Sequence, residues 1–194
     1  NPHRSKRHLL PQRMSPEPRK MKIFGDWDRF CIVTQLDADY CGVWLNGTLF
    51  FRISGNNIGD PQEDNSLRDA YYILDSIIYR KQSRINKTIF QMDYKNIFKI
   101  IDEAIYRDGE DIFKYIDESI FPSDFSIRIN VQSMLRCRVY SVSDGEKTKV
   151  VYQKEYSSEI VGVTFCDDLV EHSLTEVLGY LENTHKIEVD KENT

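Results

Sequence analysis

The sequence predicts an α+β fold, in which hairpins near both ends of the chain build an antiparallel sheet and about four helices pack on it. Segments with a two-residue apolar alternation occur in two blocks, one near the start and one after residue 124. Segments with a helical apolar stripe occupy the middle and the end. Such segregated blocks are typical of α+β domains, whereas a doubly wound fold alternates strands and helices along the chain.

The first strands are expected between residues 30 and 58. Residues 30–36 alternate in the pattern of a half-buried strand, as do residues 48–53, and residues 37–42 form the loop between them. The turn residues Gly55-Asn56-Asn57 tolerate a positive φ, so a short return strand is expected to begin at Ile58.

Three helices are expected next. The first begins at a cap formed by Asn65 or Ser66 and continues to about residue 78, and the second runs from about residue 93 to 106. The third spans about residues 110–120, stops before Pro122 and buries a stripe made of Ile112, Phe113, Ile116 and Ile120. We interpret all three stripes as core.

The second block of strands begins with the alternating residues Phe125, Ile127, Ile129 and Val131. Asp144-Gly145 is the strongest hairpin signal in the chain, and residues 149–156 are its return strand. Residues 160–165 form a further strand, and Asp167 or Asp168 opens the last helix.

Residues 1–20 differ from the rest of the chain. They contain four prolines and carry a net charge of +5, which leaves −10 for residues 21–194 because the whole chain carries −5. We expect residues 1–20 to be a disordered basic leader and residues 21–194 to be one domain. A basic tail can bind nucleic acid or acidic lipid, but an upstream extension of the reading frame, with Met21 as the start, is the favoured interpretation.

Composition excludes several classes of protein. No apolar run approaches the ~18 residues that span a bilayer. The four cysteines form no CxxC pair and the histidines have no ligand spacing, so we predict neither a metal site nor a cofactor. With no secretory signal, we expect a cytoplasmic protein with reduced thiols.

Catalytic motifs are also missing. The sequence contains no phosphate-binding loop, dinucleotide turn or nucleophile elbow, and His172 and His185 fit surface positions on the last helix. We therefore predict that the protein is not an enzyme. The alternative from a different class is a small hydrolase or transferase that uses carboxylates, because acidic pairs are plentiful.

The acidic residues are unevenly distributed. Residues 102–124 hold eight carboxylates against two basic residues, and residues 155–194 hold ten against two. Residues 125–154 are locally basic, but a domain of net charge −10 would repel a phosphate backbone, so we predict no nucleic-acid partner. An acidic face either keeps the protein in solution or docks a basic protein partner.

Four short motifs point to a family. Ile23-Phe24-Gly25-Asp26 with Arg29-Phe30, Trp44-Leu45 with Gly47, Ile58-Gly59-Asp60 and Ser66-Leu67-Arg68-Asp69 resemble the immunity protein 42 family of bacterial polymorphic-toxin systems. The resemblance is good over about residues 22–70, and beyond that only the order of elements and the Asp144-Gly145 hairpin agree. It implies a small cytoplasmic α+β protein that binds the C-terminal domain of a cognate toxin and protects the producing cell.

The motif residues have structural explanations of their own. Gly47 and Gly59 are expected where turns or bulges need backbone freedom, Trp44 as a core residue between sheet and helix, and Arg68-Asp69 as an ion pair that pins the helix. The predicted toxin-binding residues lie outside the motifs, in the acidic segment: Asp108, Glu110, Asp111, Asp117 and Glu118. Because nucleases are often basic, a nuclease toxin is the leading hypothesis for the target.

Overall fold

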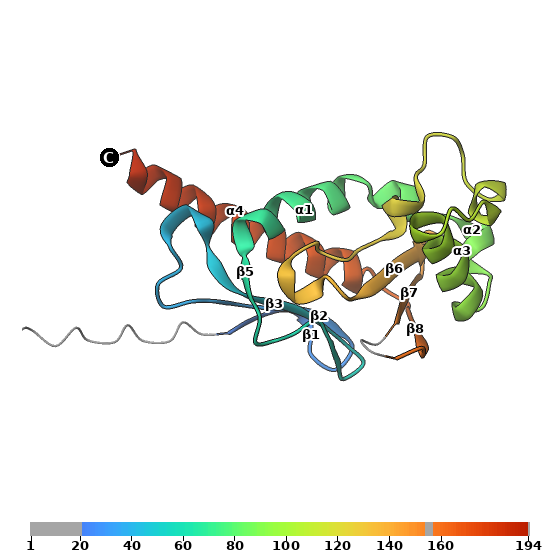
Figure 1. Cartoon of the computed structure of the whole chain (residues 1–194), viewed down its shortest axis with the longest axis horizontal. Helices are drawn as coiled ribbons and strands as arrows, with labels where there is room; N and C mark the ends of the chain where they lie inside the picture. Colours follow the sequence, from blue (N-terminus) through green and yellow to red (C-terminus); the bar gives the residue numbers. More distant parts are fainter. Residues whose placement is uncertain (1–20, 154–156, 194) are drawn as a thin grey trace, which may run out of the picture.

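The computed structural model describes residues 21–153 and 157–193 and has an α+β architecture (Figure 1). Five strands form one sheet: β1 (Lys22–Asp26), β2 (Phe30–Leu36), β3 (Asn46–Ile53), β4 (Asn56–Ile58) and β5 (Asp64–Ser66). Three form another: β6 (Arg138–Ser143), β7 (Thr148–Gln153) and β8 (Ile160–Phe165). The helices are α1 (Leu67–Tyr79), α2 (Lys87–Phe90), α3 (Tyr94–Tyr106) and α4 (Leu169–Glu192). The predicted fold class is confirmed, with the N-terminal and C-terminal hairpins in two separate antiparallel sheets.

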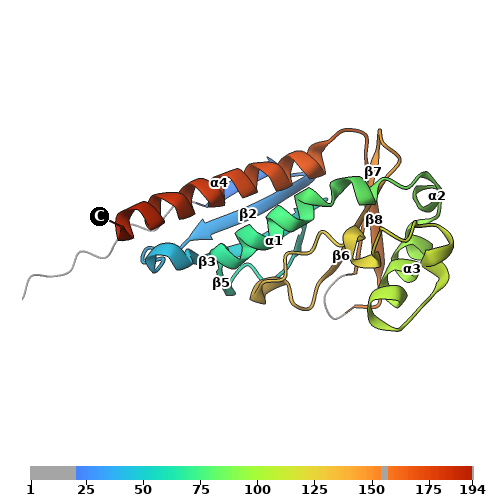
Figure 2. The ribbon, with the colours of Figure 1, turned by 90° about the horizontal axis from the view of Figure 1, so that it is seen from above.

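Two apolar clusters hold these layers together. The larger cluster lies between the five-stranded sheet and the pair α1 and α4, which run side by side across one face of that sheet (Figure 2). The smaller cluster packs α3 against the three-stranded sheet. Alternate residues of β6 and β7 enter each cluster, so this small sheet is buried on both faces and joins the two halves of the core.

Local sequence explains where most helices begin. The Ser66 side chain accepts a hydrogen bond from the backbone N–H of Asp69 at the start of α1, and Asp93 does the same for Asn96 at the start of α3. Asp168 precedes α4, which covers 24 residues and buries Val170, Leu174, Val177 and Leu181. The three starts agree with the sequence analysis, and Ser66 is one of its two predicted caps, whereas the Asp168 side chain makes no capping hydrogen bond.

The hairpins also follow their turn residues. Asp144 Oδ1 accepts hydrogen bonds from the backbone N–H groups of Glu146 and Lys147, at 2.9 and 2.7 Å, and Gly145 adopts a φ of 101°. β6 and β7 pair across this turn from Ser143↔Thr148 outward. The predicted return strand exists as β4, but it covers Asn56–Ile58 and therefore ends at Ile58, where the sequence predicted that it begins.

The third predicted helix is wrong. Residues 110–120 contain one 3-10 turn, Asp111–Lys114, followed by turns. The carbonyl of Tyr115, which a continuing helix would use, accepts instead from Nδ2 of Asn86 at 2.7 Å. Phe113 is therefore exposed on the surface and is not part of a buried stripe.

The prediction of a strand from Phe125 to Val131 is also wrong, because no continuous ladder of hydrogen bonds pairs this segment with a neighbour among the described residues. Its apolar residues are buried in the predicted alternation, but only an isolated bridge, Ser126↔Tyr140, joins this segment to β6. The Arg128 guanidinium instead donates to the carbonyl of Leu135 at 2.9 Å. The apolar alternation therefore predicts correctly which side chains are buried, but it does not predict strand pairing.

Three short elements were not predicted: β1, β5 and α2. β5 and β4 both pair with β3, and the gap between them is closed by Ser133, whose hydroxyl donates to the Leu49 carbonyl at 2.6 Å. The predicted leader, residues 1–20, lies outside the described residues.

Two motif glycines have clear steric roles. A Cβ at Gly47 would stand 2.3 Å from the carbonyl oxygen of Gln35, because β2 and β3 approach closely there. Gly59 has a φ of 101°, and a Cβ would meet Met134 and the Ser133 carbonyl at 3.1 and 3.2 Å. Gly59 therefore meets the predicted need for backbone freedom. The same prediction for Gly47 is wrong, because Gly47 lies within β3 without a positive φ and is needed for the close approach of the strands.

Candidate partner-binding surface

The sequence singled out the acidic residues 102–124. Their central part, residues 107–121, is called the acidic segment below. It lies on the surface between α3 and the 3-10 turn Pro122–Phe125, at the end of the molecule opposite the end of α4 (Figure 1). The structure leaves all five predicted residues exposed: Asp108, Glu110, Asp111, Asp117 and Glu118. Asp111 pairs with Lys114, and this lysine lowers the pKa of the Asp111 carboxyl. Within the described residues the other four make no ion pair, so their charges face solvent.

The acidic segment is fixed to the body at several points. The backbone N–H of Gly109 donates to the Glu103 carbonyl at 3.0 Å, and Asn86 holds Tyr115. Ile112 and Phe125 are fully buried in the smaller apolar cluster. A surface held in this way loses little conformational entropy when a partner binds.

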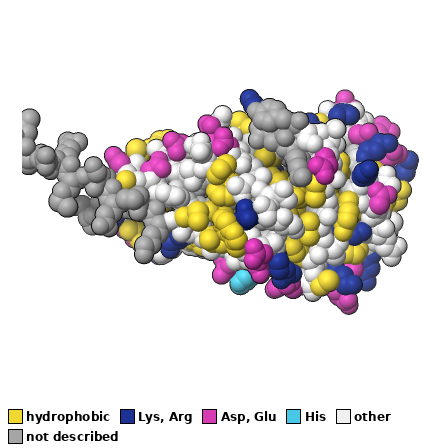
Figure 3. Space-filling model, turned by 90° about the horizontal axis from the view of Figure 1, so that it is seen from below, with side chains coloured by type: hydrophobic (Ala, Val, Ile, Leu, Met, Phe, Trp, Pro, Cys, Tyr) yellow, Lys and Arg dark blue, Asp and Glu magenta, His cyan; other side chains and the backbone are white. Residues whose placement is uncertain are grey.

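The far end of the acidic segment has an ion pair beneath it. Asp124 is buried and accepts from Arg80 at 2.7 Å and from the backbone N–H of Phe121 at 3.0 Å. Beside this pair is a hollow of about 340 Å³ between α1 and the 3-10 turn, lined by Ser76, Ile77, Arg80, Phe121, Ser123, Asp124 and Ser126. Charged side chains of both signs gather at this end of the molecule on the face shown in Figure 3, while hydrophobic side chains spread over the middle.

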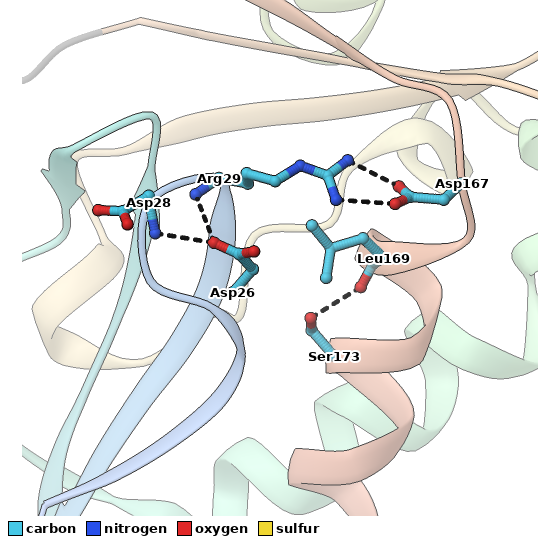
Figure 4. Close-up of polar contacts among 6 residues, drawn as sticks. All are labelled: Asp26, Asp28, Arg29, Asp167, Leu169 and Ser173. Atoms are coloured by element: carbon cyan, nitrogen blue, oxygen red, sulfur yellow. Dashed lines mark hydrogen bonds and ion pairs between the residues drawn. The ribbon is translucent and has the colours of Figure 1, made fainter.

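The second acidic stretch, near the start of α4, is engaged within the chain. Asp26 Oδ1 accepts from the backbone N–H groups of Asp28 and Arg29 and shapes the turn between β1 and β2 (Figure 4). The Arg29 guanidinium then binds Asp167 through two hydrogen bonds of 2.8 and 3.0 Å, which lower the pKa of the Asp167 carboxyl. The motif residues Asp26 and Arg29 thus connect the first hairpin to the start of α4.

Glu171 is engaged as well. Its Oε1 accepts from Arg84 at 2.7 Å, and the Arg84 side chain is only 1% exposed. Arg84 also donates to the Ile77 carbonyl at 2.8 Å, so this pair joins the end of α1 to α4. Because Asp167 and Glu171 hold elements together, they are less suited to a partner than the acidic segment 107–121.

The prediction that Trp44 lies in the core is wrong. Its side chain is 50% exposed, and the Arg68 guanidinium lies over its ring at 3.8 Å while it also pairs with Asp69 at 3.1 Å. Leu45, the next residue, takes the core position instead, with a φ of 53°. The left-handed backbone at Cys41, Gly42 and Leu45 turns Trp44 outward.

We expect Trp44→Ala to lower the free energy of unfolding by about 1 kcal/mol, because an exposed stacking contact with arginine contributes ~0.5–1 kcal/mol. A buried tryptophan would cost about 3–5 kcal/mol. Urea titration followed by circular dichroism distinguishes the two values. A loss above 3 kcal/mol would mean that Trp44 packs more deeply than the structure indicates.

Groups with catalytic potential are scattered. His172 lies on the exposed face of α4 at 3.5 Å from Glu176, and His185 stacks on Tyr71. Asp37 has a raised pKa because of burial and the nearby charge of Asp64. No cluster of three or more histidine, cysteine or acidic side chains suited to a metal ion occurs in residues 21–153 and 157–193. Over the same residues, no helix is long and apolar enough to cross a membrane.

Comparison with known proteins identifies the family. The model of immunity protein 42 matches residues 21–180, most of the chain. The chain belongs to the immunity protein 42 family. The family resemblance seen in the four N-terminal motifs is therefore confirmed, and the match extends through both sheets and half of α4.

A solved structure shares the fold. CdiI from Burkholderia dolosa AUO158 superposes with a TM-score of 0.63 at 14% sequence identity, and the alignment covers 82% of this chain and 99% of that one. A search of curated proteins found no significant match.

The acidic segment 107–121 exposes the aromatic residues Phe113, Tyr115 and Phe121, which the sequence pattern does not single out. The helical pattern predicts that Phe113 belongs to a buried stripe. A local signal existed, since Pro122 and the acidic residues around Phe113 disfavour a long buried helix.

Proposed function

We propose that this immunity protein 42 family member neutralises a cognate bacterial toxin by binding its C-terminal domain in the cytoplasm of the producing cell. Its role is inhibitory binding and not catalysis. Membership of the family carries this proposal. The fold shared with CdiI from Burkholderia dolosa supports it.

We propose further that the toxin docks on the acidic segment 107–121. Four of its carboxylates are free of ion pairs within the described residues, and the segment is anchored on the body. Complementary charge raises the association rate of two proteins from a neutral 10⁵–10⁶ toward 10⁸–10⁹ M⁻¹s⁻¹ at low salt. Rapid association is useful to an inhibitor that must bind its target before the target causes damage.

The charge of the acidic segment also suggests the class of toxin. A protein that binds phosphates carries a basic surface, so a nuclease domain is the target we favour. By the same argument we expect the immunity protein to bind neither nucleic acid nor membrane surfaces itself.

The test is protection in cells. The C-terminal domain encoded beside this gene is expressed from an inducible promoter, with and without the immunity protein, and viable cells are counted. Restored viability and a purified complex of the two proteins are expected. Failure of both would contradict the proposed function, and loss of intact DNA or RNA in the unprotected cells would identify a nuclease.

A further inference from the structure

Two phenylalanines stand out on the acidic segment 107–121. Phe113 is 56% exposed and Phe121 is 55% exposed, although neighbouring apolar residues of the same stretch, Ile112 and Phe125, are fully buried. Single exposed apolar residues are common on protein surfaces, but two phenylalanines on one short, anchored segment rich in carboxylates match the aromatic enrichment of interfaces. In this part of the chain, Ile112 and Phe125 are buried in the core, whereas the rings of Phe113 and Phe121 are exposed.

Both rings are carried by backbone that is held in place. The N–H of Phe121 donates to Asp124, which Arg80 fixes from α1, and the Arg80 guanidinium lies 5.8 Å from the centre of the Phe121 ring. Phe113 lies in the same 3-10 turn as the buried Ile112. The N–H of Phe113 donates to the Glu110 carbonyl at 3.1 Å. Because the backbone at both positions is already ordered, binding adds only the cost of fixing the two ring conformations.

The neighbourhood has the composition of an interface centre. Phe121 borders the hollow of about 340 Å³, whose wall carries the buried Asp124 carboxylate. Carboxylates surround both rings in sequence, with Glu110 and Asp111 before Phe113 and Asp117 and Glu118 before Phe121. Interface centres are rich in aromatic residues and arginine, and charged groups concentrate at the rim.

We propose that Phe113 and Phe121 are the apolar anchors of the toxin-binding surface, around which the carboxylates form a steering rim. This inference rests on the proposed function. The partner that fits is a basic protein domain with apolar depressions that receive the two rings. The acidic rim argues against a second copy of this chain, which would bring like charges together.

The two parts of the surface affect different rate constants. The carboxylates attract the partner at a distance and set the association rate, whereas the rings act only after contact and slow dissociation. Removal of a ring should therefore leave association nearly unchanged and shorten the life of the complex.

The experiment measures association and dissociation rates by surface plasmon resonance, with the C-terminal toxin domain encoded beside this gene immobilised as the probe. Phe113→Ala and Phe121→Ala are each expected to dissociate about 10–100-fold faster, with association rates within about twofold of the wild type. Trp44→Ala is the matched control, since it removes a half-exposed aromatic ring from the loop that packs against α4. It should dissociate like the wild type.

Wild-type dissociation rates for both phenylalanine variants would overturn the proposal. If the wild-type protein itself does not bind the probe, the proposed function fails instead, so the two failures are distinct. Melting temperatures of the variants are measured beside the rates. If Phe121→Ala unfolds, hydrogen exchange of the wild-type complex decides: protection of amides in residues 110–123 supports the proposal, and unchanged exchange there overturns it.

Discussion

Replacing Glu171 by alanine is expected to lower the free energy of unfolding by about 3–5 kcal/mol, the usual cost of breaking a buried ion pair by removing one partner. The Arg84 side chain is 1% exposed and would lose its counter-charge, but Glu171 is 28% exposed and both residues line a hollow of about 280 Å³, so the loss is expected at the lower end of this range. The Arg84 Nε already has no hydrogen-bond partner, so the guanidinium would keep only the Ile77 carbonyl. Urea titration of the wild type and the variant measures the difference.

Two further variants distinguish the effect of leaving the Arg84 charge unpaired from a general effect on α4. Glu176→Ala removes an exposed carboxylate from the same helix and should change stability by less than about 1 kcal/mol. The double variant Arg84→Met with Glu171→Leu removes both charges and should recover most of the loss, because a buried ion pair is often replaceable by apolar residues. A double variant no more stable than Glu171→Ala would contradict the explanation.

The elements that the sequence predicts well are those whose signals are local. The Ser66 and Asp93 caps place the starts of α1 and α3, and Asp144-Gly145 places the hairpin between β6 and β7. In each case the deciding hydrogen bonds join residues two to three positions apart. Such bonds depend on residue type and spacing, which the sequence displays directly.

The errors have their origin in contacts between distant residues. Asn86 takes the Tyr115 carbonyl and ends the 3-10 turn before a helix can form, although the two residues are 29 positions apart. Arg68 reaches back over Trp44 across 24 positions, and Leu45 replaces the tryptophan in the core. The apolar periodicity of a segment does not show which distant side chain will bind its carbonyl groups or pack on its aromatic rings.

The candidate site likewise has features that the local sequence predicts and features that depend on the fold. Charge is a property of composition, so the count of carboxylates predicts an acidic surface at residues 102–124, and its role in docking the toxin stays a prediction. Exposure of Phe113 and Phe121 depends on how the segment folds against α3 and α1, and the helical pattern around Ile112 suggested burial. The intramolecular roles of Asp167 and Glu171 also required the fold, because Arg29 and Arg84 lie far from them in sequence.

The acidic segment gives the second prediction of large effect. Reversing Glu110, Asp111 and Asp117 to lysine should slow association with the toxin domain by about one to two orders of magnitude at low salt and abolish its salt dependence. Like charges would then face the basic partner, and the steering field would be lost. The fold should survive, because all three side chains are exposed and such substitutions change stability by about ±0.5 kcal/mol each.

Stopped-flow mixing with the purified toxin domain at two salt concentrations tests this prediction, and the control is a second triple reversal. Asp75, Glu176 and Glu182 are exposed on α1 and α4, and their change to lysine alters the net charge by the same amount. If steering came from net charge alone, the two variants would slow association equally. If the acidic segment 107–121 is the docking surface, its variant must lose much more, because the interaction between charges is strongest at close range and is screened over about 10 Å at 0.1 M salt. Wild-type kinetics in the folded segment variant would place the toxin-binding surface elsewhere on the molecule.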